Sequence, residues 1–359
     1  MKKRFICLLF MIFCFSGALG EGSKLLENWQ HVEWQVDCDG LLMTVDADVL
    51  EVPVDMIVRE YHAGRVSDSF AKKTAEEMDW GALGFDLSEA DWLKDEGYYT
   101  YNASNPNESV GIFASCEFFA TRMATSYSPY SSIDVDTMYV LDQSPAGGLT
   151  WETVVHRADQ ITEMLGLQLG EPRSMKRCDD FIGRGSQNER FEYIWKKYFP
   201  ELTAEDAAQI KTMEVFFPVY YNGLRLYSGS RFDAGENFIL RTRFDLQMNQ
   251  NGEIIYLNCP IYEEWTPGDL FGEPIASDGA FELLTESYSG LILPGVESVR
   301  VDEAALEYVG ISGDQTASKG FTVYPAWIFR VAWQYESEHE LSEVTEYHAF
   351  HAITGQQLF

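Results

Sequence analysis

Two of the chain's six histidines lie three residues apart near its C-terminus, in the stretch YHAFHAITG at residues 347–355. On a helix, His348 and His351 would share a face and could bind one metal ion. In a strand, residues three apart point to opposite faces. The aromatic and β-branched residues of the stretch, followed by Thr354-Gly355, are typical of a strand that ends in a turn. The sequence therefore predicts a closing strand here and no metal site.

A second candidate is the one basic cluster in this acidic chain, formed by Arg225, Arg231, Arg241 and Arg243. Residues 238–248 alternate between apolar and polar side chains, which is the period of a strand with one buried face. This period places Arg241 and Arg243 together on the polar face. We hypothesise that they bind an anionic ligand. The alternative is that they pair across strands with local aspartates and glutamates.

A third candidate is Glu263-Glu264-Trp265, which follows a predicted strand. An aromatic ring beside carboxylates suits sugar binding, and paired carboxylates hydrolyse glycosidic bonds. The alternative is an exposed turn at a strand end. The chain has 57 acidic residues, so paired carboxylates occur by chance and no catalytic pair can be selected.

Motifs for other chemistry are absent from the sequence. It contains no G-x-S-x-G nucleophile elbow, phosphate-binding Walker loop or dinucleotide-binding glycine motif. HELSE at residues 339–343 has Glu343 where a zinc protease needs its second histidine. We therefore predict a protein that is not an enzyme and that needs neither a cofactor nor a metal.

The first twenty residues indicate the compartment. A basic MKKR precedes a run of apolar residues that ends at Ala18-Leu19-Gly20, as in a cleaved secretory signal peptide. As a helix, residues 5–19 would span about 22 Å, short of the roughly 30 Å core of a bilayer. Without the signal, the net charge falls from −31 to −34. We expect a secreted chain with no membrane span after cleavage, and such a charge repels nucleic acid.

Four cysteines remain in the mature chain, Cys38, Cys116, Cys178 and Cys259. Their long spacings disfavour a zinc site, and the sequence leaves open whether they form disulfides or stay as buried thiols.

Sequence patterns also predict the elements that must position these residues. Residues 31–53 resemble a strand, and helices are expected near 67–78, 150–165, 188–199, 202–211 and 278–289. Asn222-Gly223 and the NQNG at 249–252 predict two hairpins. In residues 321–336 the odd positions are apolar or aromatic, so Trp327 and Trp333 belong to a core or line a ligand groove.

The elements together predict an α+β fold, in which antiparallel sheets pack with a few short helices. Helix-then-strands modules of the PepSY or cystatin type would repeat along the chain. We predict a signal peptide at 1–20, an N-terminal domain at 21–148 and a C-terminal domain at 149–359. SPAGG at 144–148 is the expected linker. The C-terminal domain divides further into possible modules at 149–262 and 275–359.

Several segments, in this order, resemble a domain-of-unknown-function family of secreted or lipid-anchored proteins of Gram-positive gut bacteria. They comprise Asp46-Ala47-Asp48-Val49 before Pro53, Tyr221-Asn222-Gly223, Pro325-x-Trp327-x-Phe329 and Ala352-Ile353-Thr354-Gly355. The chain has Arg225 near the position of the family's hairpin proline, and it lacks the lipid-attachment cysteine. The C-terminal part is also similar to PepSY-type modules and to YycH/YycI-like extracytoplasmic regulators.

The resemblance implies a protein outside the membrane, at the bacterial cell envelope, that binds another protein or a small ligand. The family implies no catalytic residues. We therefore expect a secreted binding protein, and we hypothesise a regulatory role. The alternatives are an extracellular hydrolase of cell-wall or dietary polymers and a protease-inhibitory module. The sequence leaves the ligand, the partner and the oligomeric state open.

Overall fold

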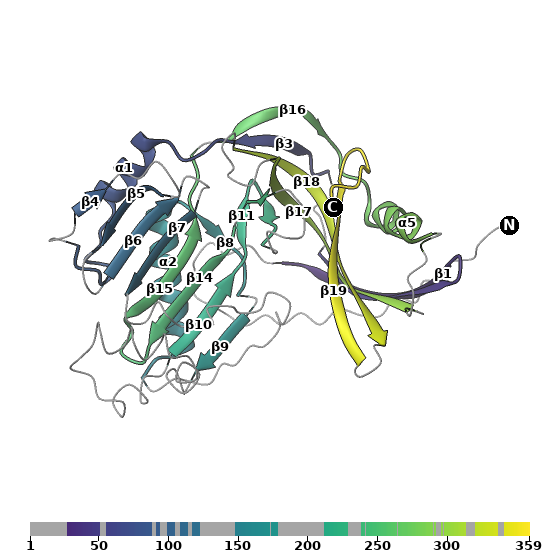
Figure 1. Cartoon of the computed structure of the whole chain (residues 1–359), viewed down its shortest axis with the longest axis horizontal. Coiled ribbons are helices and arrows are strands. Elements are labelled where there is room, and N and C mark those ends of the chain that lie inside the picture. Colours follow the sequence, from purple (N-terminus) through teal and green to yellow (C-terminus); the bar gives the residue numbers. More distant parts are fainter. Residues whose placement is uncertain are drawn as a thin grey trace.

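The computed structural model describes residues 27–50, 55–87, 91–93, 99–104, 108–113, 117–122, 148–172, 174–178, 212–228, 238–240, 242–263, 265–289, 291, 296, 298–313, 320–336 and 341–359. Their strands form an eleven-stranded and an eight-stranded sheet, and one large hydrophobic core connects the two (Figure 1). The predicted signal peptide lies outside the described residues. In the part of the chain that the structure describes, no helix is long and apolar enough to cross a membrane.

The strands of the larger sheet come from both ends of the chain. They are β1 (Trp29–Cys38), β2 (Leu41–Leu50), β3 (Val58–Ala63), β8 (Gln168–Leu169), β11 (Val219–Tyr221), β12 (Leu224–Leu226), β13 (Phe238–Ile239), β16 (Thr266–Gly272), β17 (Ser298–Ser312), β18 (Phe321–Glu336) and β19 (Leu341–His351). The antiparallel pair β17 and β18 forms a long ribbon through the middle of this sheet, which we call the β17–β18 ribbon.

Each strand of the β17–β18 ribbon changes its outer neighbour along its length. On one side, β17 pairs in parallel first with β2 and then with β12. On the other side, β18 pairs with β3 at residues 321–323 and with β19 from residue 326 onward. Pro325, which has no N–H to donate, stands in the interval between β3 and β19. On that side, β18 therefore has no ladder partner from β3 or β19 at its proline.

The smaller sheet is antiparallel throughout. Its order is β4 (Asp91–Leu93), β5 (Tyr99–Ser104), β6 (Glu108–Phe113), β7 (Glu117–Arg122), β15 (Ile254–Pro260), β14 (Phe244–Asn249), β10 (Thr212–Phe217) and β9 (Ser174–Cys178). Helices α1 (Asp68–Glu77) and α2 (Trp151–Leu165) pack against this sheet, through β5 and β14. Helix α5 (Ser277–Tyr288) packs instead on the larger sheet, against β1 and β19.

Local signals in the sequence explain several of these elements. The hydroxyl of Ser67 caps α1 by accepting from the amide of Phe70 at 3.2 Å, and Thr150 caps α2. Gly166 ends α2 in the left-handed conformation, with φ of 65°. Asn222 and Gly223, at φ of 47° and 82°, form the predicted tight turn between β11 and β12. The helices predicted near 67–78 and 150–165 and the hairpin predicted at Asn222-Gly223 are confirmed. The helices expected near 188–199 and 202–211 lie outside the described residues.

The predicted fold class is wrong. The chain is mostly β, with a large mixed sheet, instead of helix-then-strands modules with antiparallel sheets. One reason is local: residues 31–53 contain two strands, β1 and β2, joined at Asp39-Gly40, and this turn signal divides the predicted strand. The larger reason is that β2 and β12 join β17 in parallel from distant parts of the chain. Local alternation indicates a strand but not its partner.

Strands from both sides of residue 148 share each sheet. For example, β7 pairs with β15 in the smaller sheet, and β2 pairs with β17 in the larger one. The boundary at 148 and the modules at 149–262 and 275–359 stay predictions about units that fold independently.

Candidate functional site

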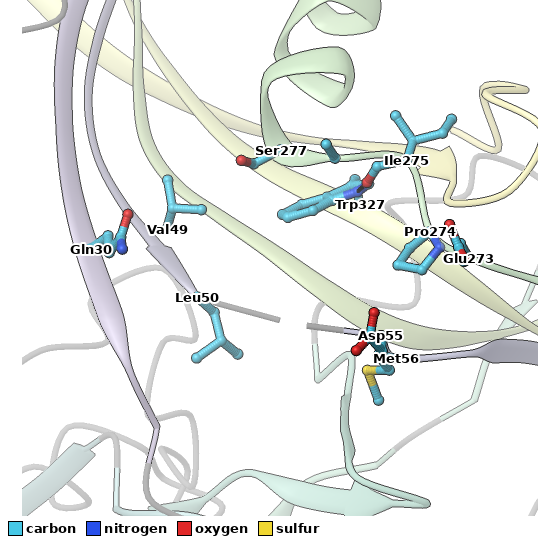
Figure 2. A pocket seen from close by; sticks show the side chains of 11 residues that line it. Gln30, Val49, Leu50, Asp55, Met56, Glu273, Pro274, Ile275, Ser277 and Trp327 are labelled. Atoms are coloured by element: carbon cyan, nitrogen blue, oxygen red, sulfur yellow. Dashed lines mark hydrogen bonds between the residues drawn. The ribbon is translucent and has the colours of Figure 1, made fainter. Parts of the chain in front are cut away.

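A groove with a volume of about 370 Å³ opens beside the N-terminus of α5 (Figure 2). This volume lies at the lower end of the range for small-ligand sites. The groove lies where the end of β2, the start of β3 and the link from β16 to α5 come together. Its described lining consists of Gln30, Val49, Leu50, Asp55, Met56, Glu273, Pro274, Ile275, Ala276, Ser277 and Trp327.

The indole of Trp327 forms part of the groove's floor and is held in place. It is 3% exposed, and its Nε1 donates a hydrogen bond of 2.8 Å to the carbonyl of Ile275. The amide of Ile275 in turn donates to the carbonyl of Ala352 at 2.7 Å. A Cβ on Gly279 would lie 2.9 Å from the side chain of Ile275, so this glycine lets the link pack closely on α5. The link is therefore fixed from three directions.

The charges at the rim of the groove are negative. Asp55 and Glu273 are exposed there, and no cationic side chain is among the described lining residues. Asp55 has a left-handed backbone, with φ of 68°, which aspartate tolerates better than most residues. The N-terminus of α5 has no side-chain cap and contributes about half a positive charge. Two full carboxylate charges exceed this half charge, so the rim favours a cation.

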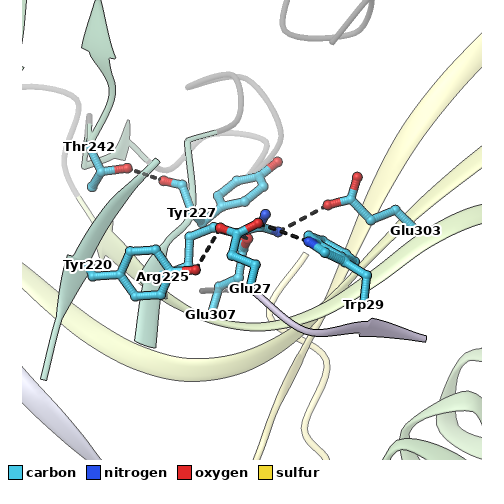
Figure 3. A network of polar contacts seen from close by, with 8 residues as sticks. All are labelled: Glu27, Trp29, Tyr220, Arg225, Tyr227, Thr242, Glu303 and Glu307. Carbon is cyan, nitrogen blue, oxygen red and sulfur yellow. Dashed lines mark hydrogen bonds and ion pairs between the residues drawn. The ribbon is translucent and has the colours of Figure 1, made fainter. Parts of the chain in front are cut away.

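The opposite face of the β17–β18 ribbon carries a buried polar network (Figure 3). Arg225, which is 2% exposed, donates through Nε to Glu307 and through Nη2 to Glu303, the latter at 3.0 Å. The guanidinium also lies 5.1 Å from the centre of the Trp29 ring. Glu27 accepts from the hydroxyl of Tyr220 at 2.6 Å and from Nε1 of Trp29 at 2.9 Å. The network thus fixes the start of β1 to β11, β12 and β17.

Burial and charge act on this network in opposite ways. Burial alone would lower the pKa of Arg225, but Glu307 and Glu303 raise it above its ordinary value. Burial raises the pKa of Tyr220, and the neighbouring charge of Glu27 raises it further. Arg225 is therefore charged and Tyr220 neutral at ordinary pH. Arg225 already serves two carboxylates, so it is a structural ion and not a free anion-binding group.

Arg243, predicted as an anion ligand, directly precedes β14 of the eight-stranded sheet. Its Nε donates to Asp245 at 2.7 Å, and its guanidinium lies over the ring of Phe216. Burial alone would lower the pKa of Arg243, but the charge of Asp245 raises it above its ordinary value. The partner is a local aspartate, as the alternative expected, but it lies in the same segment and not across strands. Arg241 lies outside the described residues, so its role stays a prediction.

The structure does not bring Glu263 and Trp265 together as a sugar platform. Glu263 accepts a hydrogen bond of 2.5 Å from the hydroxyl of Ser67, the cap of α1. Trp265 is 3% exposed and packs in an aromatic cluster, with its ring centre 4.0 Å from that of Tyr221 and 4.9 Å from that of Tyr262. Both groups thus stabilise the connection from β15 to β16. Glu264 lies outside the described residues.

The two C-terminal histidines lie on opposite faces of β19, as predicted. His348 contacts the hydroxyl of Tyr288 at the end of α5, at 2.8 Å. The Nδ1 of His351 accepts from the amide of Ile353 at 3.1 Å, so its Nε2 carries the proton that it donates to Glu60 at 2.9 Å. His351 therefore holds the terminal turn whose Ala352 carbonyl supports the groove.

Two of the four cysteines, Cys38 and Cys259, are buried in the core. The side chains of Cys116 and Cys178 lie outside the described part of the chain, so the question of disulfides stays open as the sequence left it. No group of three potential metal ligands occurs among the described residues.

Sequence reasoning found one residue of the groove, Trp327, and missed the others. Gln30, Asp55 and Glu273 are single polar residues at element ends, and no motif marks them. Three segments that carried the family resemblance do meet here: Val49 and Trp327 line the groove, and Ala352 supports its link. The occurrence of these three segments in the family's order was the one signal in the sequence that pointed to this groove.

Comparison with known proteins identifies the fold alone. No family model matches the chain, and no curated protein matches it. A crystal structure of an uncharacterized protein from Eubacterium rectale is similar, with a TM-score of 0.63 and 14% sequence identity. The similarity covers 91% of this chain and 92% of that one, so the whole two-sheet architecture is shared.

Proposed function

We propose that the chain is a secreted binding protein whose groove takes a ligand with an apolar body and a positive charge. One observation carries this proposal: two exposed carboxylates stand over an apolar floor, and the described lining offers no cation. Val49, Met56 and Trp327 supply apolar contact, and a cation beside an indole gains a further cation–π attraction. Because hydrogen bonds already hold the link at Ile275 in place, the free-energy cost of ordering the site on ligand binding is small.

The proposed role is binding and not catalysis. Catalysis would need a nucleophile or a base near the rim carboxylates. The described lining contains neither histidine nor cysteine, and its one serine is Ser277. The secreted location rests on the signal-like first twenty residues. A positive charge in the ligand agrees with the net charge of −31, which attracts cations over a long range.

Calorimetric titration tests the proposal with ligands of matched size. Arylalkylammonium ions are compared with arylalkyl carboxylates, and short peptides containing one lysine or arginine form a separate arm. We expect the cations to bind and the anions not to bind. Affinity for both a free amine and a peptide would place the cation recognition in the groove itself, whereas binding of the anions at equal strength would refute the proposal.

The matched variant replaces both rim carboxylates, as Asp55→Asn with Glu273→Gln. Asparagine keeps the tolerance for a left-handed backbone, and glutamine keeps the shape of glutamate. We expect affinity for the cations to fall about two- to thirtyfold, since each exposed charge pair is worth about 0.2–1 kcal/mol and the variant removes two. The control is Glu282→Gln, an exposed residue of α5 outside the groove. Turnover of glycans, peptides or esters by the purified protein would contradict the non-catalytic role.

A further inference from the structure

The side of β1 that faces away from β2 is a second surface that suits a partner. β1 is ten residues long and pairs along its whole length with β2. Among the described strands it pairs with β2 alone, so it forms one edge of the eleven-stranded sheet (Figure 1). An edge strand presents backbone donors and acceptors that another strand can use.

The side chains of β1 divide sharply between its two faces. Val32, Trp34 and Val36 point to the α5 side and are half-buried, and the ring of Trp34 meets that of Phe281 edge to face at 5.6 Å. These apolar side chains continue the core to the very edge of the sheet. A further strand with apolar residues at alternate positions would complete their burial.

The other face of β1 and β2 is acidic. Glu33 and Asp37 on β1 and Asp46 and Asp48 on β2 are all exposed, and we call these four residues the acidic face. Glu33 stands directly opposite Asp46 in the ladder, an arrangement of like charges that is unfavourable in an isolated sheet. His31 lies between the two aspartates of β2, at 3.3 Å from Asp46 and 3.1 Å from Asp48.

We propose that β1 accepts an extended, basic segment of another protein as an additional strand. Alternate apolar side chains of this segment would cover Val32, Trp34 and Val36, and the basic side chains between them would face the acidic face. The same charges disfavour pairing of β1 with β1 of a second copy, since that would place carboxylates beside carboxylates. This inference concerns β1 and β2 between residues 31 and 48, and it does not depend on a ligand in the groove.

A peptide of ten alternating lysine and valine residues is the probe, titrated into the full secreted chain at low salt. Hydrogen exchange should show new protection of every second β1 amide between residues 31 and 37, namely those that face away from β2. A glutamate–valine peptide of equal length should not bind, because its carboxylates would meet the acidic face. Because a strand uses every second amide for one ladder, N-methylation of one alternate set of lysine–valine amides should abolish binding, and methylation of the other set should spare it.

The double variant Glu33→Gln with Asp46→Asn removes two exposed charges and should weaken binding of the lysine–valine peptide about two- to thirtyfold. Glu76→Gln on α1 is the control, because Glu76 is exposed and lies on a different element. The groove variant, Asp55→Asn with Glu273→Gln, is measured in the same titration and separates the two proposals. If it loses the lysine–valine peptide while Glu33→Gln with Asp46→Asn still binds the peptide, this inference is overturned. Protection of β1 in the absence of peptide, together with a dimer in sedimentation, would also overturn it by making a second copy the occupant.

Discussion

The two faces of the β17–β18 ribbon use charge in opposite ways. On one face, Arg225 stands between Glu303 and Glu307, and all three are buried. On the other face, Leu306 and Trp327 pair across the ribbon, and Trp327 reaches the groove, whose charges are exposed at the rim. Both features lie where the ribbon changes its outer neighbours, because β17 passes from β2 to β12 and β18 from β19 to β3.

The difference shows what separates structural charge from charge that is available for a ligand. Where a strand of the ribbon changes its neighbouring strand, the regular ladder is interrupted, and the side chains on both faces of the sheet are affected. On the Arg225 face, side chains of opposite sign fill the interruption and satisfy one another. On the groove face, the interruption stays open, and the carboxylates of Asp55 and Glu273 have no cationic partner among the described residues that line it. The first arrangement stabilises the fold, and the second is the one that we propose for ligand recognition.

The largest expected effect comes from breaking the buried network. Arg225→Met should lower the free energy of unfolding by about 3–5 kcal/mol, because two buried carboxylates lose their only cation in the described network. Urea unfolding measures this change. Arg300→Met is the matched control on β17: Arg300 also pairs with a carboxylate, Asp302 at 3.0 Å, but its side chain is 49% exposed. The control should cost less than about 1 kcal/mol. Equal losses in the two variants would contradict the comparison.

A smaller effect is expected from loosening the floor of the groove. Trp327→Phe keeps the aromatic body but leaves the carbonyl of Ile275 without its indole partner, at a cost of about 1–3 kcal/mol. Exchange of the amides at residues 273–277 should quicken, and affinity for cations in the groove should fall. Trp80→Phe is the control, since Trp80 donates a similar hydrogen bond to the carbonyl of Ala75 in α1. It should cost comparable stability without changing ligand affinity. An unchanged affinity in Trp327→Phe would separate the indole from recognition.

The smallest effect concerns acid. Burial lowers the pKa of His348, against the opposing influence of Glu346. As pH falls below about 6.5, the unfolded chain therefore binds a proton at this histidine before the folded chain does, and the folded state loses stability. His348→Gln cannot titrate, so its stability should decline less between pH 7 and pH 5, by less than about 1.4 kcal/mol per pH unit. Parallel curves for the two proteins, from urea unfolding at each pH, would show that His348 does not contribute.

The local elements could be predicted from the sequence because each depends on residues a few positions apart. Ser67 and Thr150 cap their helices through amides three residues onward, and Asn222-Gly223 turns the chain within its own hairpin. The alternation in residues 321–336 predicted the buried face of β18 correctly, since Phe321, Val323, Trp327, Phe329 and Val331 all lie in the core. The opposite orientation of His348 and His351 follows from the same period.

The fold class failed for a reason that recurs in large sheets. A sequence pattern shows that a segment is a strand and which of its faces is apolar, but it contains no record of the neighbour. β17 has neighbours from residues 41–50 and 224–226, and each joins it in parallel through a long connection. Reading the chain as successive hairpins therefore produced antiparallel modules, and the mixed sheet was missed.

The sequence by itself determined the three described helices, the tight turns, the apolar faces of the long strands and the strongly negative charge, because these depend on composition and on near neighbours. Only the tertiary structure decided which charges are satisfied and which remain open. Arg225 meets Glu303 and Glu307 about eighty positions away, and Gln30, Asp55, Glu273 and Trp327 surround one groove from four distant elements. Burial and pairing of a charge depend on the packing of distant segments, and that packing is a property of the whole fold.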